Sequence, residues 1–223
     1  QTLPPVTIDL LERMAATDAY ILNETATLDA VEQVQTLEAA DASAFSTQLT
    51  THWHHSDYLV LADGEDYESA VLASSFAARL NAPLVFTAGL PDGEVEGVKE
   101  ALYVKEALWV DLQSASNDAP ANTTVIHHVD DAIQWLKQKS IEISYVALTN
   151  VSDRQAGRAP KTSLTAPFYT ARRGGLVVPI ALDMPQATLD QGLVPEAAQF
   201  LHGRYDVLGS VPEYLAIVGA HDA

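Results

Sequence analysis

The 223-residue sequence contains no cysteine, few basic residues and no long apolar run. Without cysteine, the chain cannot form disulfides, use a thiolate nucleophile, or hold zinc or iron–sulfur clusters through sulfur. Only 12 Lys and Arg oppose 30 Asp and Glu, which gives a net charge of −18. This charge argues against binding to nucleic acid or anionic membranes, because phosphate contacts need clustered basic side chains. No segment approaches the roughly 20 apolar residues of a membrane helix, so membrane insertion is not expected.

The hydrophobic residues, in contrast, make up 48% of the chain. This fraction is enough for a packed core and excludes a mostly disordered protein. The sequence begins at Gln1, without a basic or apolar leader segment. We therefore expect a processed mature protein or a fragment. The apolar run Tyr214–Val218 lies close to Ala223 and suggests that the parent polypeptide continues.

Short apolar runs alternate with amphipathic stretches along the chain. The predicted strands are Ala19–Leu22, Tyr58–Ala62, Pro83–Thr87, Ala107–Asp111, Thr124–His127, Ser144–Leu148, Leu176–Ile180 and Tyr214–Val218. The predicted helices are Leu28–Ala39, Tyr67–Leu80, Glu94–Tyr103, Asp130–Lys139, Ser163–Arg173 and Pro195–Tyr205. Nearly continuous Val, Leu and Ile indicate strands that are buried on both faces. The pattern predicts an α/β fold with a Rossmann-like, mostly parallel sheet flanked by helices.

Two parts of the chain repeat the order strand, helix, strand. Residues 58–87 form the first copy and residues 145–180 the second, with about six extra residues in a strand–helix loop, where insertions are tolerated. We interpret them as two related βαβ halves. The predicted division falls in the polar stretch Ser114–Thr123 and gives units 1–113 and 114–223, although a single domain is also compatible with the pattern.

The loop Asp63-Gly64-Glu65-Asp66 follows a predicted buried strand and precedes a helix. Ligands of open α/β sheets bind at such positions, and Asp63, Glu65 and Asp66 could hold calcium through their carboxylates. The simpler interpretation is that Gly64 makes the turn and Asp66 caps the helix. These acids would repel a nucleotide phosphate, and the sequence has no glycine-rich phosphate loop.

A second candidate loop follows the strand that ends near Asn150. Its polar residues Asn150, Ser152 and Asp153 could bind a sugar or another polar ligand, or could serve only in a turn. Asn150 also starts an N-x-[ST] sequence, as do Asn23 and Asn122. These three asparagines are glycosylation sites if the protein is exported to a glycosylating compartment.

Histidines cluster at residues 52–55 and 127–128. His52 and His55 would share one face of a helix and could bind zinc, but no third ligand is evident at a familiar spacing. His127 and His128 end a predicted strand, which is a common location for catalytic groups. They have no assigned nucleophile, so surface or core-edge histidines are the simpler interpretation.

The stretch Tyr58–Thr87, YLVLADGEDYESAVLASSFAARLNAPLVFT, resembles the cell-wall-binding repeat of the type 2 family of bacterial and archaeal surface proteins. The likeness rests on Gly64-Glu65-Asp66-Tyr67 with Ala70, and on the segment Arg79–Leu84. The second half follows the same plan loosely but lacks the GED motif. The resemblance implies a Rossmann-like, non-catalytic module of a cell-surface or S-layer-type protein.

A shorter likeness concerns Val211–Gly219 with His221 and Asp222, which resemble a segment that precedes the catalytic region of gingipain-like cysteine peptidases. That family needs a cysteine, which this chain lacks. The likeness therefore implies at most the non-catalytic part of such a peptidase.

Together these features favour an extracellular, acidic module for envelope attachment, assembly or adhesion, with no cofactor unless calcium binds. The expected partners are an envelope polymer or neighbouring surface-protein subunits, including further copies of this chain. Two alternatives stay open. One is an enzyme, either the peptidase fragment or a hydrolase acting through His127 and His128. The other is an extracellular solute-binding module with its cleft between the halves.

Overall fold

The computed structural model describes residues 18–22, 33–91, 93–113, 119–150, 162–180, 194–202 and 214–218. Its strands are β1 (Asp18–Leu22), β2 (Gln33–Leu37), β3 (Tyr58–Ala62), β4 (Leu84–Phe86), β5 (Glu106–Val110), β6 (Thr123–Ile126), β7 (Tyr145–Asn150), β8 (Leu176–Ile180) and β9 (Tyr214–Val218). Its helices are α2 (Ala42–Leu49), α3 (Tyr67–Leu80), α4 (Glu94–Ala101), α5 (Val129–Gln138), α6 (Ala166–Ala171) and α7 (Val194–His202), with short 3-10 helices η1 (Thr50–His52) and η3 (Thr162–Thr165). Within these ranges, no helix has the length and apolar character needed to cross a bilayer.

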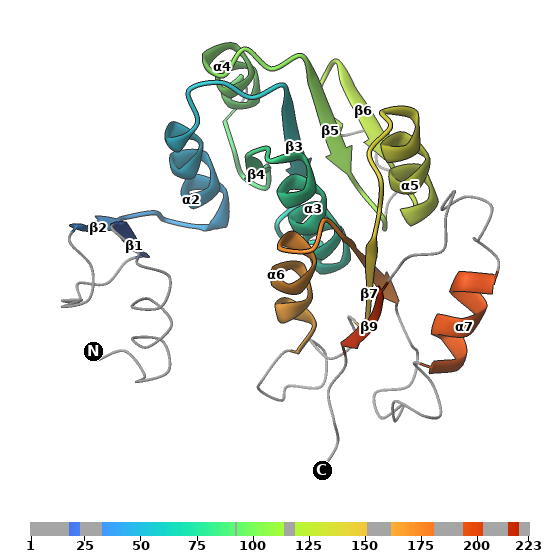
Figure 1. The fold of residues 1–223 in the computed structure, drawn as a ribbon. Helices are drawn as coiled ribbons and strands as arrows, with labels where there is room; N and C mark the ends of the chain where they lie inside the picture. Colours follow the sequence, from blue (N-terminus) through green and yellow to red (C-terminus); the bar gives the residue numbers. More distant parts are fainter. Residues whose placement is uncertain are drawn as a thin grey trace.

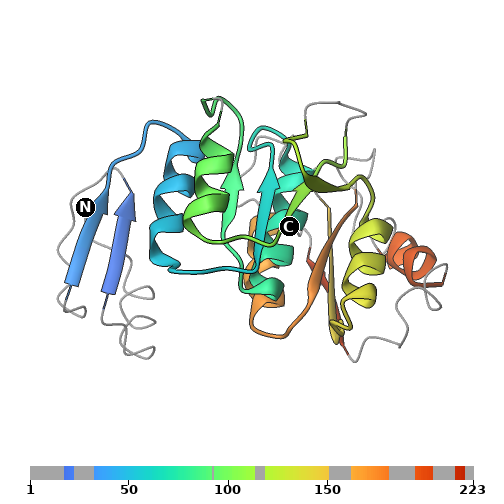
Figure 2. The ribbon, with the colours of Figure 1, turned by 90° about the horizontal axis from the view of Figure 1, so that it is seen from above.

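The strands form parallel sheets flanked by helices, which confirms the predicted α/β class. The first main sheet has the order β4-β3-β5-β6 and the second the order β8-β7-β9. A separate pair, β1 and β2, lies beyond α2 (Figures 1 and 2). The prediction of a helix over Leu28–Ala39 is wrong at β2. Its two apolar residues, Val34 and Leu37, are three positions apart, which also fits a helix, and the pairing with β1 makes this segment a strand.

Both main sheets share the arrangement predicted for two βαβ halves. In each, the helix after the central strand leads to a parallel neighbour on one side, and the next strand pairs on the other. The second unit is six residues longer, because Val60 lies opposite Leu84 whereas Val146 lies opposite Leu176. β6 pairs with β5 although it follows residue 114. The division into units 1–113 and 114–223 stays a prediction.

Helix α3 packs against both main sheets and lies at the centre of the molecule (Figure 1). Its Leu72 and Phe76 are fully buried in a cluster that also contains Val60 of the first sheet and Val146 of the second. The opposite flank contributes Ser75, whose Oγ accepts the backbone N–H of Val177 at 3.0 Å. A helix that is buried on two sides needs small side chains, and α3 supplies Ala and Ser between its large residues.

The start of β8 lies unusually close to β7. A Cβ atom at Gly175 would overlap the carbonyl oxygen of Tyr145 and lie 2.8 Å from the Tyr145 Cβ. Both groups belong to the strand interface, so neither can move without disturbing the pairing of β7 and β8.

We therefore predict that Gly175→Ala lowers the free energy of unfolding by about 2–4 kcal/mol. Gly97→Ala is the matched control, because a Cβ at Gly97 meets nothing within 4 Å. Since Gly97 lies within α4, alanine should stabilise the protein there by about 0.5–1 kcal/mol. Urea unfolding measures both changes, and equal effects of the two substitutions would contradict the close approach at Gly175.

A polar contact joins the start of β5 to α5. Glu106 accepts hydrogen bonds from Trp135 Nε1 at 2.8 Å and Lys139 Nζ at 2.6 Å. Burial raises the pKa of Glu106, but the hydrogen bonds from Lys139, Trp135 and Thr124 and the charge of Lys139 lower it more, so the pKa lies below its usual value of 4.5. Trp135 in turn packs edge-on against Phe76 with ring centroids 5.5 Å apart, so this contact reaches the core.

A carboxyl whose pKa is lowered on folding stabilises the protein above its unfolded pKa and loses that effect as the pH falls through the folded value. Glu106→Gln should therefore destabilise the protein at pH 7, and the difference from the wild type should shrink as the pH falls below 4.5. Unfolding in urea across this pH range measures it, with the exposed Glu100→Gln as control. A difference that does not depend on pH would contradict the ion pair.

Candidate functional site

The carboxyl ends of the four strands of the first sheet meet at one edge. Asp63 follows β3, Thr87 follows β4, Asp111 follows β5 and His127 follows β6. Because these strands are parallel, this is the edge at which open α/β sheets bind ligands. We refer to it as the carboxyl edge.

The loop Asp63–Asp66 is held by its own backbone. Asp63 Oδ1 accepts the N–H of Glu65 at 2.9 Å, which forms a tight turn. Asp66 Oδ1 accepts the N–H groups of Glu68 at 3.1 Å and Ser69 at 3.4 Å, so Asp66 is the N-cap of α3. Gly64 lies against Phe86, where a Cβ would approach the Phe86 Cβ to 3.2 Å. The turn and cap roles expected of Gly64 and Asp66 are therefore present.

Ser69 connects this loop to the next strand end. It is fully buried, donates its hydroxyl to Asp66 Oδ2, and accepts the N–H of Leu112 at 2.7 Å. Ser69 is not among the site residues predicted from the sequence, because nothing in the sequence relates it to Leu112, which lies 43 positions away. The available signal was a small polar residue in the first turn of an amphipathic helix, three positions after a capping aspartate.

Carboxylates occupy the helix N-termini around this edge. Asp41 Oδ1 accepts the N–H of Ala44 at 2.8 Å at the start of α2. Asp131 Oδ2 accepts the N–H groups of His127 at 3.1 Å and His128 at 2.8 Å at the start of α5. The first turn of α4 carries Glu94 and Glu96.

The chemical consequence is that the edge disfavours anions. Helix N-termini bind phosphate through free N–H groups and their partial positive charge. Here, carboxylates of the protein itself cap these helices or lie in their first turns. The pKa of Glu68 is raised above its usual value, first by burial and then by the charge of Asp66, and these effects outweigh a hydrogen bond from Gln113. A further negative charge is therefore unfavourable there.

The histidines are placed differently from one another. His127 Nδ1 lies 3.2 Å from the backbone oxygen of Asp111, at the carboxyl edge. His55 lies at the opposite edge, 3.5 Å from Asp57 and beside the Tyr103 ring. In the part of the chain that the structure describes, no three His, Asp or Glu side chains are arranged to hold a metal ion. Calcium binding by Asp63, Glu65 and Asp66 stays a prediction.

The structure describes some, but not all, of the remaining predicted site residues. Asn150 ends β7 and is half-buried, while Ser152, Asp153 and Asn23 lie outside the described residues. Asn122 is an exposed turn residue with a positive φ of 56° before β6. The two units meet near this edge through Tyr67 and Ser163, whose oxygens are 2.7 Å apart.

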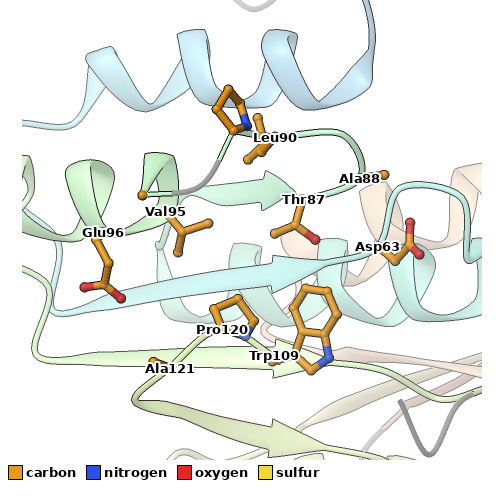
Figure 3. A pocket seen from close by; sticks show the side chains of 11 residues that line it. Asp63, Thr87, Ala88, Leu90, Val95, Glu96, Trp109, Pro120 and Ala121 are labelled. Carbon is orange, nitrogen blue, oxygen red and sulfur yellow. The ribbon is translucent and has the colours of Figure 1, made fainter. Parts of the chain in front are cut away.

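A hollow of about 450 Å³ lies beside the carboxyl edge (Figure 3). Its lining comes from the ends of β3 and β4, from β5, from the start of α4 and from the loop before β6; it includes Asp63, Thr87, Val95, Glu96, Trp109 and Pro120. The indole Nε1 of Trp109 is buried there and has no hydrogen-bond partner among the residues that the structure describes. An unpaired buried N–H is rare and needs an explanation.

Ser69→Ala tests the link between α3 and the end of β5. The substitution leaves the N–H of Leu112 without its acceptor, so we expect a loss of about 1–2 kcal/mol in the free energy of unfolding. Ser74→Ala is the control, because the Ser74 hydroxyl bonds only the carbonyl of Ala70 within the same helix. Ser74→Ala should change stability by less than about 0.5 kcal/mol. If hydrogen exchange at the Leu112 amide stays unchanged in Ser69→Ala, the link is wrong.

No protein-family model matches the sequence, and no curated protein matches it. Among solved structures, the fold is similar to that of Cwp6 from Clostridium difficile, a cell wall protein, with a TM-score of 0.58 at 14% sequence identity. The likeness covers 97% of this chain and 36% of the Cwp6 chain. The chain thus spans about a third of its structural neighbour, and at this identity the comparison shows a shared fold.

Proposed function

We propose that the chain is a non-catalytic module of a cell-surface protein and attaches it to the cell envelope. The observation that carries this proposal is the carboxyl edge of the first sheet. There, the helix N-termini that serve ligand binding in many Rossmann-like enzymes are capped or flanked by the protein's own carboxylates. Such an edge suits a structural module better than an enzyme that acts on phosphorylated substrates or uses a nucleotide cofactor.

The residues behind the resemblance to the type 2 cell-wall-binding repeat have structural roles that support the same proposal. Asp66 caps α3, and the hydroxyl of Tyr67 reaches Ser163 of the second unit. Near the end of the motif, the carbonyl of Pro83 accepts the N–H of Val60 at 3.0 Å. The motif thus builds the βαβ unit itself. The fold likeness to a cell wall protein of C. difficile points in the same direction.

The partner that we propose is a polymer of the envelope, with neighbouring surface-protein subunits as further contacts. A chain of charge −18 and an anionic polymer repel each other unless cations lie between them. Calcium at the carboxylates of the carboxyl edge, or a saline medium, would remove this repulsion.

Co-sedimentation with bacterial sacculi tests the attachment. We expect the purified protein to pellet with sacculi that retain their secondary polymers and to stay in solution with sacculi stripped of those polymers. Equal binding to both preparations, or none to either, would contradict attachment through such a polymer.

The calcium proposal has a separate test. If Asp63, Glu65 and Asp66 bind calcium, the ion should raise the melting temperature of the wild type but not of Asp63→Asn/Glu65→Gln, and a chelator should reverse the increase. Asp66 is left intact because its cap is needed for α3. A melting temperature that does not respond to calcium or chelator would contradict calcium binding by these residues.

The hollow beside Trp109 favours a second candidate, the binding of a small neutral solute. Asp63 and Glu96 could accept hydrogen bonds from hydroxyl groups, and a ligand acceptor could satisfy Trp109 Nε1. The hollow lies at the first main sheet, whereas the sequence predicts a solute cleft between the halves. Thermal-shift measurements with neutral and acidic monosaccharides distinguish this candidate, which predicts stabilisation by the neutral sugars alone.

A further inference from the structure

The charged side chains are sorted between the two edges of the fold. The described residues contain seven Lys and Arg, namely Arg79, Lys99, Lys105, Lys137, Lys139, Arg172 and Arg173. Each lies near the C-terminal end of a helix or directly before a strand. Because the helices of βαβ units run antiparallel to the strands, these positions belong to the edge opposite the carboxyl edge. We call it the amino edge.

This sorting follows from the helix dipoles. Acids favour helix N-termini and bases favour helix C-termini, and parallel strands place all like ends of the connecting helices on the same side. The capping and first-turn acids Asp41, Asp66, Glu94 and Asp131 therefore gather at the carboxyl edge. The described bases are confined to the amino edge, where Asp57, Glu100, Glu106 and Glu142 accompany them, whereas the carboxyl edge has acids without described Lys or Arg.

Most of the basic charge beside the first main sheet is neutralised by neighbouring acids. Lys99, Lys105 and Lys139 form ion pairs with Glu96, Asp57 and Glu106 at 2.7, 2.8 and 2.6 Å. The arginines near the second unit contact neutral groups instead. Arg79 donates to the carbonyl of Glu142 at 2.8 Å, and the Arg173 guanidinium lies 5.4 Å from the ring centroid of Tyr145.

Exposed aromatic side chains surround these arginines. Phe168 and Tyr169 of α6 are 56% and 45% exposed, and Tyr214 at the start of β9 is 63% exposed. They are connected through shared neighbours. The Phe168 and Tyr169 rings contact each other, Arg173 bonds the carbonyl of Tyr169, and Tyr145 under Arg173 pairs with Tyr214. Figure 1 shows α6 close to β7 and β9.

We define the aromatic–arginine patch as Phe168, Tyr169, Arg172, Arg173 and Tyr214. Aromatic residues and arginine are the types enriched in protein interfaces, and Lys and Glu are depleted there. The composition is unusual for this chain, in which Asp and Glu outnumber Lys and Arg by 30 to 12.

We propose that the aromatic–arginine patch binds the acidic carboxyl edge of a second copy of this chain, so that copies associate head to tail. Charge complementarity favours this occupant, since among the described residues the contacts of Arg79 and Arg173 are with neutral groups, and the opposite end of the same module presents acids. A twofold dimer through the patch would gather both copies of Arg172 and Arg173 in one interface without acidic patch residues opposite them, which is unfavourable. A head-to-tail contact is heterologous, and repeated contacts build open rows of the kind that a surface layer requires. This inference rests on the proposed assembly role at the cell surface.

Sedimentation velocity of the purified protein tests the contact. We expect the mean sedimentation coefficient to rise with protein concentration at about 0.15 M salt, where the overall repulsion between two copies of charge −18 is screened beyond about 8 Å, and to stop rising at 1 M salt, where screening acts within about 3 Å. The patch variant Phe168→Ser/Arg172→Glu should weaken association at least about tenfold, as loss of a central interface contact does. The matched control Tyr103→Ser/Lys137→Glu changes an exposed aromatic and a base of the helices beside the first sheet and should associate like the wild type.

A mixing experiment identifies the geometry. An edge variant, Glu65→Lys/Glu94→Lys, blocks the acidic end and leaves the patch intact. Alone, the patch and edge variants should both stay monomeric, and their mixture should form 1:1 dimers and no larger species. Circular dichroism and melting curves confirm that each variant is folded.

Three outcomes would overturn the proposal: a wild type that is monomeric at every concentration, association that the patch variant leaves unchanged, or mixed variants that do not dimerise. Patch-dependent binding to sacculi by a monomeric wild type would assign the patch to the envelope polymer instead. Since sedimentation uses the protein alone, failure of head-to-tail association is distinguishable from failure of envelope attachment.

Discussion

The burial of α3 between two parallel sheets is the constraint on which the rest of the structure depends. Leu72 and Phe76 fill the core, while Ser69 and Ser75 accept backbone N–H groups at the end of β5 and in β8. A central helix with large side chains on every face could not bring the two units so close. Within the second sheet, the close approach of Gly175 to Tyr145 likewise depends on a residue without a side chain.

This architecture also determines the electrostatics. Parallel strands place the helix N-termini at one edge, and the protein covers them with its own acids. In Rossmann-like enzymes the equivalent positions are free to bind phosphate. The same sheet geometry that creates an enzyme's binding edge therefore creates here an acidic end, and leaves the arginines and exposed aromatic residues of the second unit as its counterpart. Attachment and assembly are the functions that we propose for such a polar module.

Much of the fold could be predicted from the sequence, because buried parallel strands and their helices have strong local patterns. Tyr58–Ala62, Leu176–Ile180, Tyr214–Val218 and the helix Tyr67–Leu80 have the predicted bounds. The strand β2 was missed because its few apolar residues also fit a helical spacing. The site was predictable only where its chemistry is local, as with the cap Asp66. The bond from Leu112 to Ser69, the contact of Arg173 with Tyr145 and the sorting of charge between edges depend on tertiary packing, which residue spacing does not encode.

The central claim is that the protein's own acids close the carboxyl edge to the anionic ligands of Rossmann-like enzymes in the absence of bridging cations. Amide NMR of the labelled protein tests it directly, with the resonances of Glu68, Ser69 and Leu112 as reporters during separate additions of a dinucleotide and of solubilised envelope polymer. The account predicts that the dinucleotide leaves these three amides unshifted, while the polymer shifts resonances of the protein. Saturable shifts of Glu68 and Ser69 on addition of the dinucleotide would contradict it.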